Sequence, residues 1–477
     1  MRDFRPRTTT AIVMMVITML TASAQIGKRF PSERKVVKDP VTGAELIFLT
    51  STSGGDSKIY QTHNQWTSDG NWVIFRSNRA RGEAMAVNEK TGDIVQVSEG
   101  GYTGMLNVAR KSMKLYFMRD TTTRRRFVPP QGAPGGQQPA AQPPQAAQQN
   151  RPQGTFPRVS PAIQVVEVDL AKLFADSESG KLKTAADYQK VLGYTPPEMG
   201  AGGDMALDAN EDFVYFRIGR DAAQKNLPEG TKIEANFGAR NMGAGPSGIG
   251  KMDLKTGKCE IVVAVPFQVG HIQTNPWVPG EIVFCWETGG KAPQRTWTVM
   301  ADGTGLRPLY PEADFEWVTH EAVITKDEVA IAIMGHRKPG IPDIPADPKN
   351  PGQEAGWGPS GTREHPTGLG IVNLRTREMT IAGQTESGSG LWHVHGSPDG
   401  RFAVGDDFSR GIYLIDRKTR EMILLSTGHK PTASDHPHPT FKDDGTKIEI
   451  QSAMLSEDGR SMNICIIPVP EEWLKRK

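Results

Sequence analysis

HNQWTSDGNWVIF, at residues 63–75, recurs as HVHGSPDGRFAVG at residues 393–405 and as HPTFKDDGTKIEI at residues 438–450. Each copy begins with a histidine, carries an Asp-Gly turn six residues later and ends in a short apolar run. β-Branched and aromatic residues in short runs after such turns are typical of β-strands. The repeat therefore predicts an all-β protein built from similar units.

Seven such strands follow polar turns along the chain. They cover residues 72–75, 114–117, 213–216, 281–284, 329–332, 401–404 and 447–450. His393 and His438 are 45 residues apart, and a four-stranded propeller blade takes about 40–45 residues. We therefore expect a seven-bladed β-propeller with four-stranded antiparallel blades. A further strand at residues 45–49 is expected to complete the last blade and close the ring, which removes exposed edges.

The N-terminal segment is typical of a secretory signal at residues 1–24. Three arginines (Arg2, Arg5 and Arg7) precede a short apolar run at 11–20, and Ala22-Ser23-Ala24 fits a cleavage site. Cleavage would leave Gln25 as the new terminus, with no stable membrane span and a periplasmic or secreted location. The alternative interpretation is a membrane anchor, which a run this short fits less well. Residues 25–477 are expected to form a single propeller domain.

Two insertions interrupt the repeat. Residues 129–157 are rich in Pro, Gln and Ala with almost no large apolar side chains, which predicts a loop without a packed core inside the second blade. Residues 337–364 are rich in Pro and Gly and fall within the fifth blade. They are expected to form a surface loop, or alternatively a lid over the central channel.

Charge and cysteine content exclude two classes of protein. Loss of residues 1–24 would leave a formally neutral chain, whereas nucleic-acid binding would need a net basic surface. Only three cysteines occur, Cys259, Cys285 and Cys465. An exported chain with so few is not a disulfide scaffold, so its core must carry the fold.

The histidines point to the chemistry. His63, His320, His393 and His438 share one position in the repeat, and His436 lies two residues before His438. Equal positions in a propeller meet near the channel, at the innermost strands, so these imidazoles should converge. A His-x-His pair on one strand projects to one side, and three imidazoles suit Zn, Mn, Fe, Cu or Ni. The alternative is that each is a hydrogen-bonded polar core residue; His395 is a weaker member of the group.

The C-terminal half, from about residue 265, resembles the oligogalacturonate lyases, which are seven-bladed propellers. The resemblance rests on five spaced motifs: Val269-Gly270-His271, Phe284-Cys285-Trp286-Glu287, Arg295-Thr296-Trp297, Val318-Thr319-His320-Glu321 and Asp435-His436-Pro437-His438-Pro439. Turn motifs alone would be less specific, because TolB-like propellers share them.

The resemblance implies a set of site residues. It implies a divalent metal, typically Mn²⁺, bound by His320, His436 and His438, with His271 as the base and Arg295 meeting a substrate carboxylate. A glutamine ligand of the family corresponds here to Ala433, which cannot bind a metal; Ser434, Asp435, a water or substrate would have to fill that position. His393 and His63 are expected to contact substrate, and Glu287 and Glu321 to support the histidines by hydrogen bonding.

The residue types fit β-elimination in uronate oligosaccharides. The proton at C5 of a uronate lies beside a carboxylate, and a metal or arginine there stabilises the charge that develops when a neutral histidine removes it. A glycoside hydrolase would instead need paired carboxylates. We therefore expect a metal-dependent lyase of short oligogalacturonides or related uronates. The alternative is a non-catalytic TolB-like periplasmic propeller that acts as a binding or assembly module.

Overall fold

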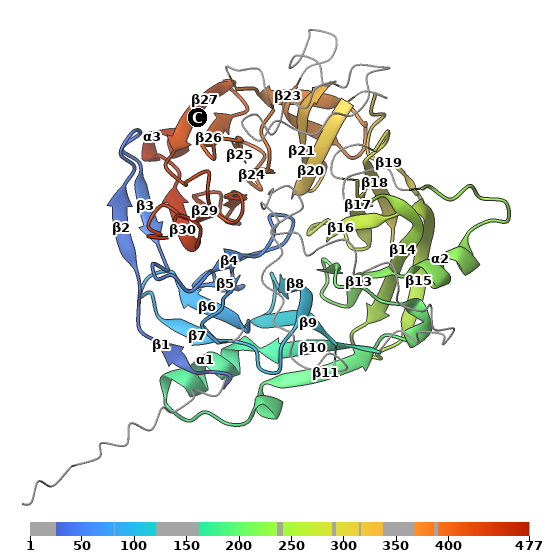
Figure 1. Cartoon of the computed structure of the whole chain (residues 1–477), viewed down its shortest axis with the longest axis horizontal. Helices are drawn as coiled ribbons and strands as arrows, with labels where there is room; N and C mark the ends of the chain where they lie inside the picture. The colour runs from blue at the N-terminus through green and yellow to red at the C-terminus, as the bar shows by residue number, and fades with distance from the viewer. Residues whose placement is uncertain are drawn as a thin grey trace, which may run out of the picture.

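The computed structural model describes residues 25–80, 82–120, 162–235, 242–288, 292–313, 316–336, 367–385 and 390–476. Within these ranges the strands form seven antiparallel sheets arranged in a ring (Figure 1). The predicted seven-bladed β-propeller is therefore confirmed. Short helices lie at the outside and at one face of the ring.

The first three sheets follow one another along the chain. The first contains β1 (Arg29–Phe30), β4 (Ser57–Lys58), β5 (Trp72–Arg76), β6 (Ala84–Asn88) and β7 (Ile94–Gln96). The second contains β8 (Thr103–Val108), β9 (Lys114–Asp120), β10 (Ile163–Asp169) and β11 (Gln189–Tyr194). The third contains β12 (Met205–Leu207), β13 (Phe213–Ile218), β14 (Ala244–Asp253) and β15 (Cys259–Phe267).

The next three sheets have the same order. The fourth contains β16 (Val269–Thr274), β17 (Glu281–Trp286), β18 (Thr296–Met300) and β19 (Arg307–Pro308). The fifth contains β20 (Glu316–Thr325), β21 (Glu328–His336), β22 (Gly368–Asn373) and β23 (Met379–Gly383). The sixth contains β24 (Val394–Gly396), β25 (Phe402–Asp406), β26 (Ile412–Asp416) and β27 (Glu421–Ser426).

The seventh sheet joins the two ends of the chain. Its strands are β28 (Thr440–Phe441), β29 (Lys447–Ser452), β30 (Asn463–Pro468), β3 (Glu45–Phe48) and β2 (Lys35–Lys38). β3 pairs with β30 in the register Ile47 to Ile466 and Phe48 to Cys465, so the predicted closure of the ring is confirmed. This sheet and the first have five strands rather than four, because β2 and β1 each add an outer strand that the repeat pattern does not predict.

The repeated apolar runs are the second strands of their sheets. A second strand is covered by a neighbouring sheet on both faces, so β17 and β25 are buried along their whole length and read as continuous apolar runs. The innermost strands, which include β8, β12, β16, β20 and β24, contact one another around the central axis (Figure 1). Two of them, β16 and β20, carry His271 and His320.

The core lies between adjacent sheets rather than at the axis. One cluster joins Phe48 of the last sheet to Phe402 and Leu414 of the sixth, and all three side chains are buried. The described cysteines are all free thiols, as expected from their number. Apolar packing between blades therefore holds the ring together.

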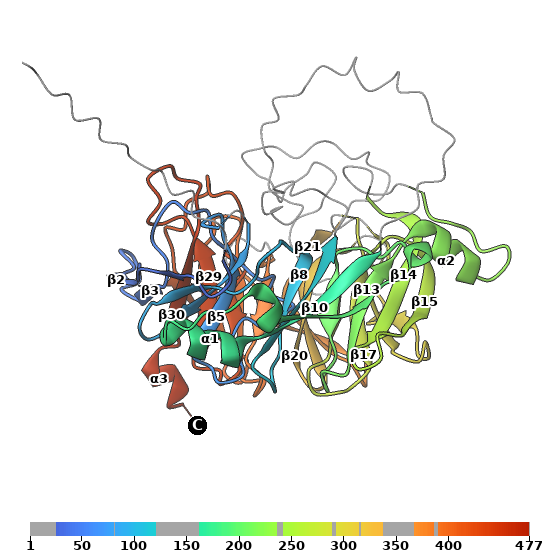
Figure 2. The same ribbon diagram turned by 90° about the horizontal axis from the view of Figure 1, so that it is seen from below.

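Helices occupy the periphery. They are α1 (Leu170–Glu178), α2 (Arg220–Asn226), α3 (Glu471–Leu474) and the 3-10 turns η2 (Ala185–Asp187) and η3 (Pro197–Met199). Asp169 caps α1 by accepting a hydrogen bond from the Lys172 amide, and Phe174 stacks on Trp72 of the first sheet. In Figure 2, α3 and the carboxyl end project from one face of the ring. Among the described residues, no helix has both the length and the apolar character needed to cross a membrane.

Three predicted segments lie outside the described residues: the signal at 1–24 and the insertions at 129–157 and 337–364. The strands that flank the insertions are described. β9 pairs with β10 in the second sheet and β21 pairs with β22 in the fifth.

Candidate functional site

Three of the site histidines have a left-handed backbone. The φ angle is 49° at His271, 39° at His320 and 52° at His438. His271 and His320 also lie where the pairing of β16 and β20 with the next strand shifts register. A left-handed conformation costs a residue other than glycine about 1–3 kcal/mol, and such strain gathers at functional sites. The bulges turn these side chains away from ordinary strand directions and toward one cluster.

Tyr60 lies inside this cluster. Its ring centroid is 5.0 Å from that of His271 and 5.1 Å from that of His438, and its hydroxyl is 2.5 Å from Nδ1 of His320. Burial, followed by the negative charge of Glu321, raises the pKa of Tyr60 well above its ordinary value, so the phenol keeps its proton. Tyr60 belongs neither to the histidine register nor to the spaced motifs, so the sequence patterns do not identify it.

His320, His393 and His438 lie close together with their rings tilted. The ring centroids of His393 and His438 are 3.7 Å apart, and those of His320 and His393 are 4.2 Å apart. Burial, and then the charge of neighbouring imidazoles, lowers the pKa of both His320 and His393 well below the ordinary value. The rings of His320 and His393 are therefore neutral, which is the form that binds metal ions.

Two ring nitrogens in this cluster have no hydrogen-bond partner among the described residues. Nδ1 of His438 is 2.9 Å from Oε1 of Gln61, so His438 donates there and its Nε2 carries the lone pair. Nε2 of His393 and Nε2 of His438 are buried, and neither makes a hydrogen bond with the described residues. Buried acceptors without a donor are rare. A cation would satisfy them, and one ligand atom each of His393, Asp406 and His436 lies within 4.8 Å of the other two, so the residue types suit the metal that the sequence predicts.

Two carboxylates complete the surroundings. Oδ2 of Asp435 is 3.2 Å from Nε2 of His438, and Oδ2 of Asp406 is 3.4 Å from Nδ1 of His436. Despite these short distances, neither Nε2 of His438 nor Nδ1 of His436 makes a hydrogen bond with the described residues. Neighbouring ligands of one ion lie roughly 3 Å apart when each metal bond is about 2.1 Å. The side chain of Ala433 packs with Ala453 and Met462, so this position supplies a methyl group to the core.

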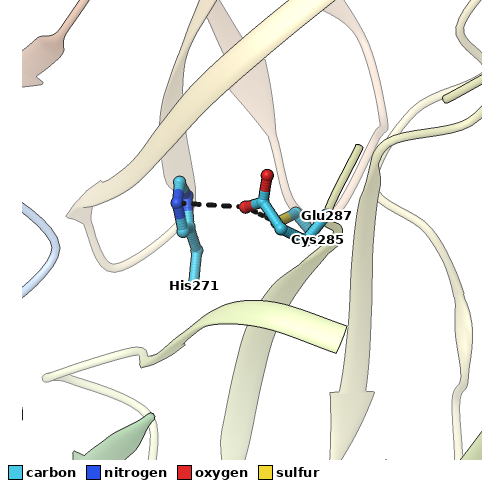
Figure 3. A group of neighbouring side chains, drawn as sticks. All are labelled: His271, Cys285 and Glu287. Carbon is cyan, nitrogen blue, oxygen red and sulfur yellow. Dashed lines mark hydrogen bonds and ion pairs between the residues drawn. The ribbon is translucent and has the colours of Figure 1, made fainter. Parts of the chain in front are cut away.

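His271 lies between two carboxylates. Its Nδ1 is 3.0 Å from Oε1 of Glu321, and its Nε2 is 3.3 Å from Oε2 of Glu287, an ion pair drawn as a dashed line in Figure 3. Burial lowers the pKa of His271, but the charge and hydrogen bond of Glu321 and the charge of Glu287 outweigh it and raise the pKa above the ordinary value. Gly270 permits this approach, since a Cβ there would lie 2.9 Å from Cβ of Glu287.

Arg295 binds the same carboxylates from the other side. Its Nε is 3.3 Å from Oε2 of Glu321, and its Nη2 is 3.8 Å from Oε2 of Glu287. The side chain is 2% exposed, and Nη1 has no hydrogen-bond partner among the described residues. A buried guanidinium with a free N–H is a suitable donor to a carboxylate ligand. The thiol of Cys285 lies beside this network, 3.7 Å from Glu287 (Figure 3).

Other histidines lie apart from the cluster. Nε2 of His63 donates to the carbonyl of Met205 at 2.8 Å, and Nδ1 lies 2.7 Å from the hydroxyl of Thr62. Burial lowers the pKa of His63 to about 4. Nδ1 of His395 accepts from the Phe441 amide. The structure thus brings His271, His320, His393, His436, His438 and Arg295 close together, whereas a substrate contact for His63 stays a prediction.

Two solved structures share this architecture over nearly the whole chain. An oligogalacturonate lyase in complex with manganese superposes with a TM-score of 0.63 at 17% identity and covers 95% of this chain and 100% of its own. An oligogalacturonate lyase from Vibrio parahaemolyticus superposes with a TM-score of 0.63 at 16% identity, and the match covers 94% of this chain and 100% of that structure. The chain has the fold of the oligogalacturonate lyases. No protein-family model and no curated protein matches the sequence, so the likeness is one of fold.

Proposed function

We propose that this protein is a metal-dependent lyase that cleaves short oligogalacturonides, or related uronate oligosaccharides, by β-elimination. One observation carries the proposal: buried imidazole nitrogens that make no hydrogen bond with the described residues lie in a histidine cluster, next to a histidine and an arginine that share two carboxylates. The imidazole nitrogens suit a divalent cation. The histidine and arginine suit the removal of a proton next to a substrate carboxylate. Their occurrence together on this propeller fold favours a lyase over a binding module.

The metal ligands in this proposal are His320, His436 and His438, and the ion is Mn²⁺. All three rings are buried and contact the same central His393. When bound, the cation would neutralise the uronate carboxylate and stabilise the charge that develops on it.

Arg295 and His271 act on the substrate. Nη1 of Arg295 donates to the substrate carboxylate, which makes the neighbouring C5 proton more acidic. His271 in its neutral form accepts that proton; the electron pair of the C5–H bond forms the C4–C5 double bond, and the bond from C4 to the glycosidic oxygen breaks. The departing oxygen takes up a proton from the His271 imidazolium or from water. Because the pKa of His271 is raised, this step needs a higher pH than an ordinary histidine base would.

The direct test is incubation of the purified chain with di- and trigalacturonate and Mn²⁺. We expect ultraviolet absorbance to rise as the unsaturated uronate forms, and His271→Ala to abolish the rise. A lack of product with galacturonate, glucuronate and mannuronate oligomers would reject the lyase. If, in addition, no metal copurified, the chain would be better explained as a TolB-like binding propeller.

Export is part of the proposal. The first 24 residues carry the signal pattern, and a periplasmic or secreted enzyme would meet oligosaccharides outside the cytoplasm. N-terminal sequencing of the mature protein should start at Gln25; a start at Met1 would contradict the proposed cleavage.

A further inference from the structure

We propose that His393 is an additional ligand of the divalent cation, fixed in its binding form by Asp406. This inference rests on the metal site of the proposed function and replaces the substrate contact expected for His393. It also supplies a donor that Ala433 cannot provide.

Asp406 determines which nitrogen of His393 is free. The carboxylate accepts from the backbone N–H of His393 at 2.7 Å and lies 3.1 and 3.2 Å from Nδ1. Asp406 is fully buried and His393 is 1% exposed. A carboxylate oxygen only accepts, so Nδ1 carries the proton and Nε2 carries a lone pair. A carboxylate behind an imidazole is the arrangement that commonly orients metal-binding histidines.

The ring that carries the free nitrogen lies among the other histidines. Nε2 of His393 is buried and makes no hydrogen bond with any described residue. A buried acceptor of this kind is unfavourable unless a donor or a cation satisfies it. Nε2 of His438 is itself an acceptor without a donor, so it cannot satisfy Nε2 of His393, and a cation is the simplest partner.

His393 is also the ring closest to the other proposed ligands. Its centroid lies 4.2 Å from His320, 3.7 Å from His438 and 5.3 Å from His436. Two imidazoles on one ion have centroids roughly 5 Å apart when each metal bond is about 2.1 Å, which the separation from His436 matches, whereas His320 and His438 would have to move away from His393. One ligand atom each of His393, His436 and Asp406 already lies within 4.8 Å of the other two. Asp406 additionally lies 3.4 Å from Nδ1 of His436, so one carboxylate is next to both histidines.

The test measures Mn²⁺ binding to the full-length chain by isothermal titration and by pulsed electron paramagnetic resonance, which counts coordinated imidazole nitrogens. We compare the wild type with His393→Ala, His393→Gln and Asp406→Asn. The matched control is His395→Ala, a buried histidine two residues along whose nitrogen bonds the Phe441 amide. Circular dichroism and thermal melts without metal confirm that each variant folds.

We expect His393→Ala to weaken Mn²⁺ binding by 10- to 100-fold and to lose one coordinated nitrogen, and Asp406→Asn to weaken it by about tenfold. His393→Gln keeps a donor atom and should retain part of the affinity, while His395→Ala should bind within twofold of the wild type. Unchanged affinity and nitrogen count in His393→Ala, with a wild type that binds Mn²⁺, would overturn this inference alone. A wild type that binds no divalent metal would reject the proposed metal site as well.

Discussion

Replacing Glu287 with glutamine should shift the acid limb of the pH–rate profile to lower pH. Glu287 is one of two carboxylates that keep the pKa of His271 high, and its Oε2 lies 3.3 Å from Nε2 of that ring. Full charges at this distance attract by about 5 kcal/mol at an effective dielectric constant near 20. Desolvation of the carboxylate and the remaining amide dipole offset much of this, so we expect a shift of about one to two pKa units.

The sign follows from the role of His271. Abstraction of the C5 proton needs the neutral imidazole, and its fraction rises with pH through the pKa. Lowering that pKa by one unit should raise the rate about tenfold well below the wild-type midpoint and change it little at high pH. The rate of formation of the unsaturated product between pH 5 and 9 measures the effect, and a nuclear magnetic resonance titration of His271 measures the pKa without substrate.

The matched control is Glu260→Gln, which removes a surface carboxylate on β15 that pairs with Lys258 and should leave the profile unchanged. An acid limb that stays in place in Glu287→Gln, or that moves to higher pH, would refute the assignment of His271 as the base. A titration shift without a rate shift would show that Glu287 acts on His271 but that another group takes the proton.

Other predictions concern the metal, the core and a buried acid. His320→Ala should release bound Mn²⁺ and remove lyase activity, as measured by elemental analysis and by product absorbance; retention of both would exclude it as a ligand. Phe48→Ala should lower the free energy of unfolding in urea by about 3–5 kcal/mol, whereas Val41→Ala, at 72% exposed, should change it by less than about 0.5 kcal/mol. Burial raises the pKa of Glu449 to about 8, so the folded chain holds a proton there that the unfolded chain has already lost. The free energy of unfolding of the wild type should therefore fall as the pH rises from 5 to 8. An equal fall with pH in Glu449→Gln would contradict this.

The architecture could be predicted from the sequence because each blade repeats one local pattern. The apolar runs of β5, β25 and β29 are recognisable since a second strand is buried on both faces, and the strand at residues 45–49 is visible for the same reason. The extra strand β1 has only two residues, which is too short to leave a periodic signal. The sequence alone could not place it.

The candidate site could be predicted only in part. The repeat register and the spaced motifs together found His320, His393, His436 and His438. They missed Tyr60, whose contact with His320 depends on how the turn after β4 folds. They also missed Asp406, because its place at the end of β25 matches no motif and its partner is the backbone and ring of His393. A side chain that only orients another side chain forms no recognisable sequence motif here.

The seventh sheet has a consequence for how this chain reaches its native state. Because Ile47 pairs with Ile466, the ring cannot close until nearly the whole chain has been synthesised. Contacts between such distant segments form slowly, since closing a long loop costs entropy before any packing rewards it. If the signal directs export, this late closure is compatible with translocation of an unfolded chain, because the ring closes only after the C-terminal strands have crossed the membrane.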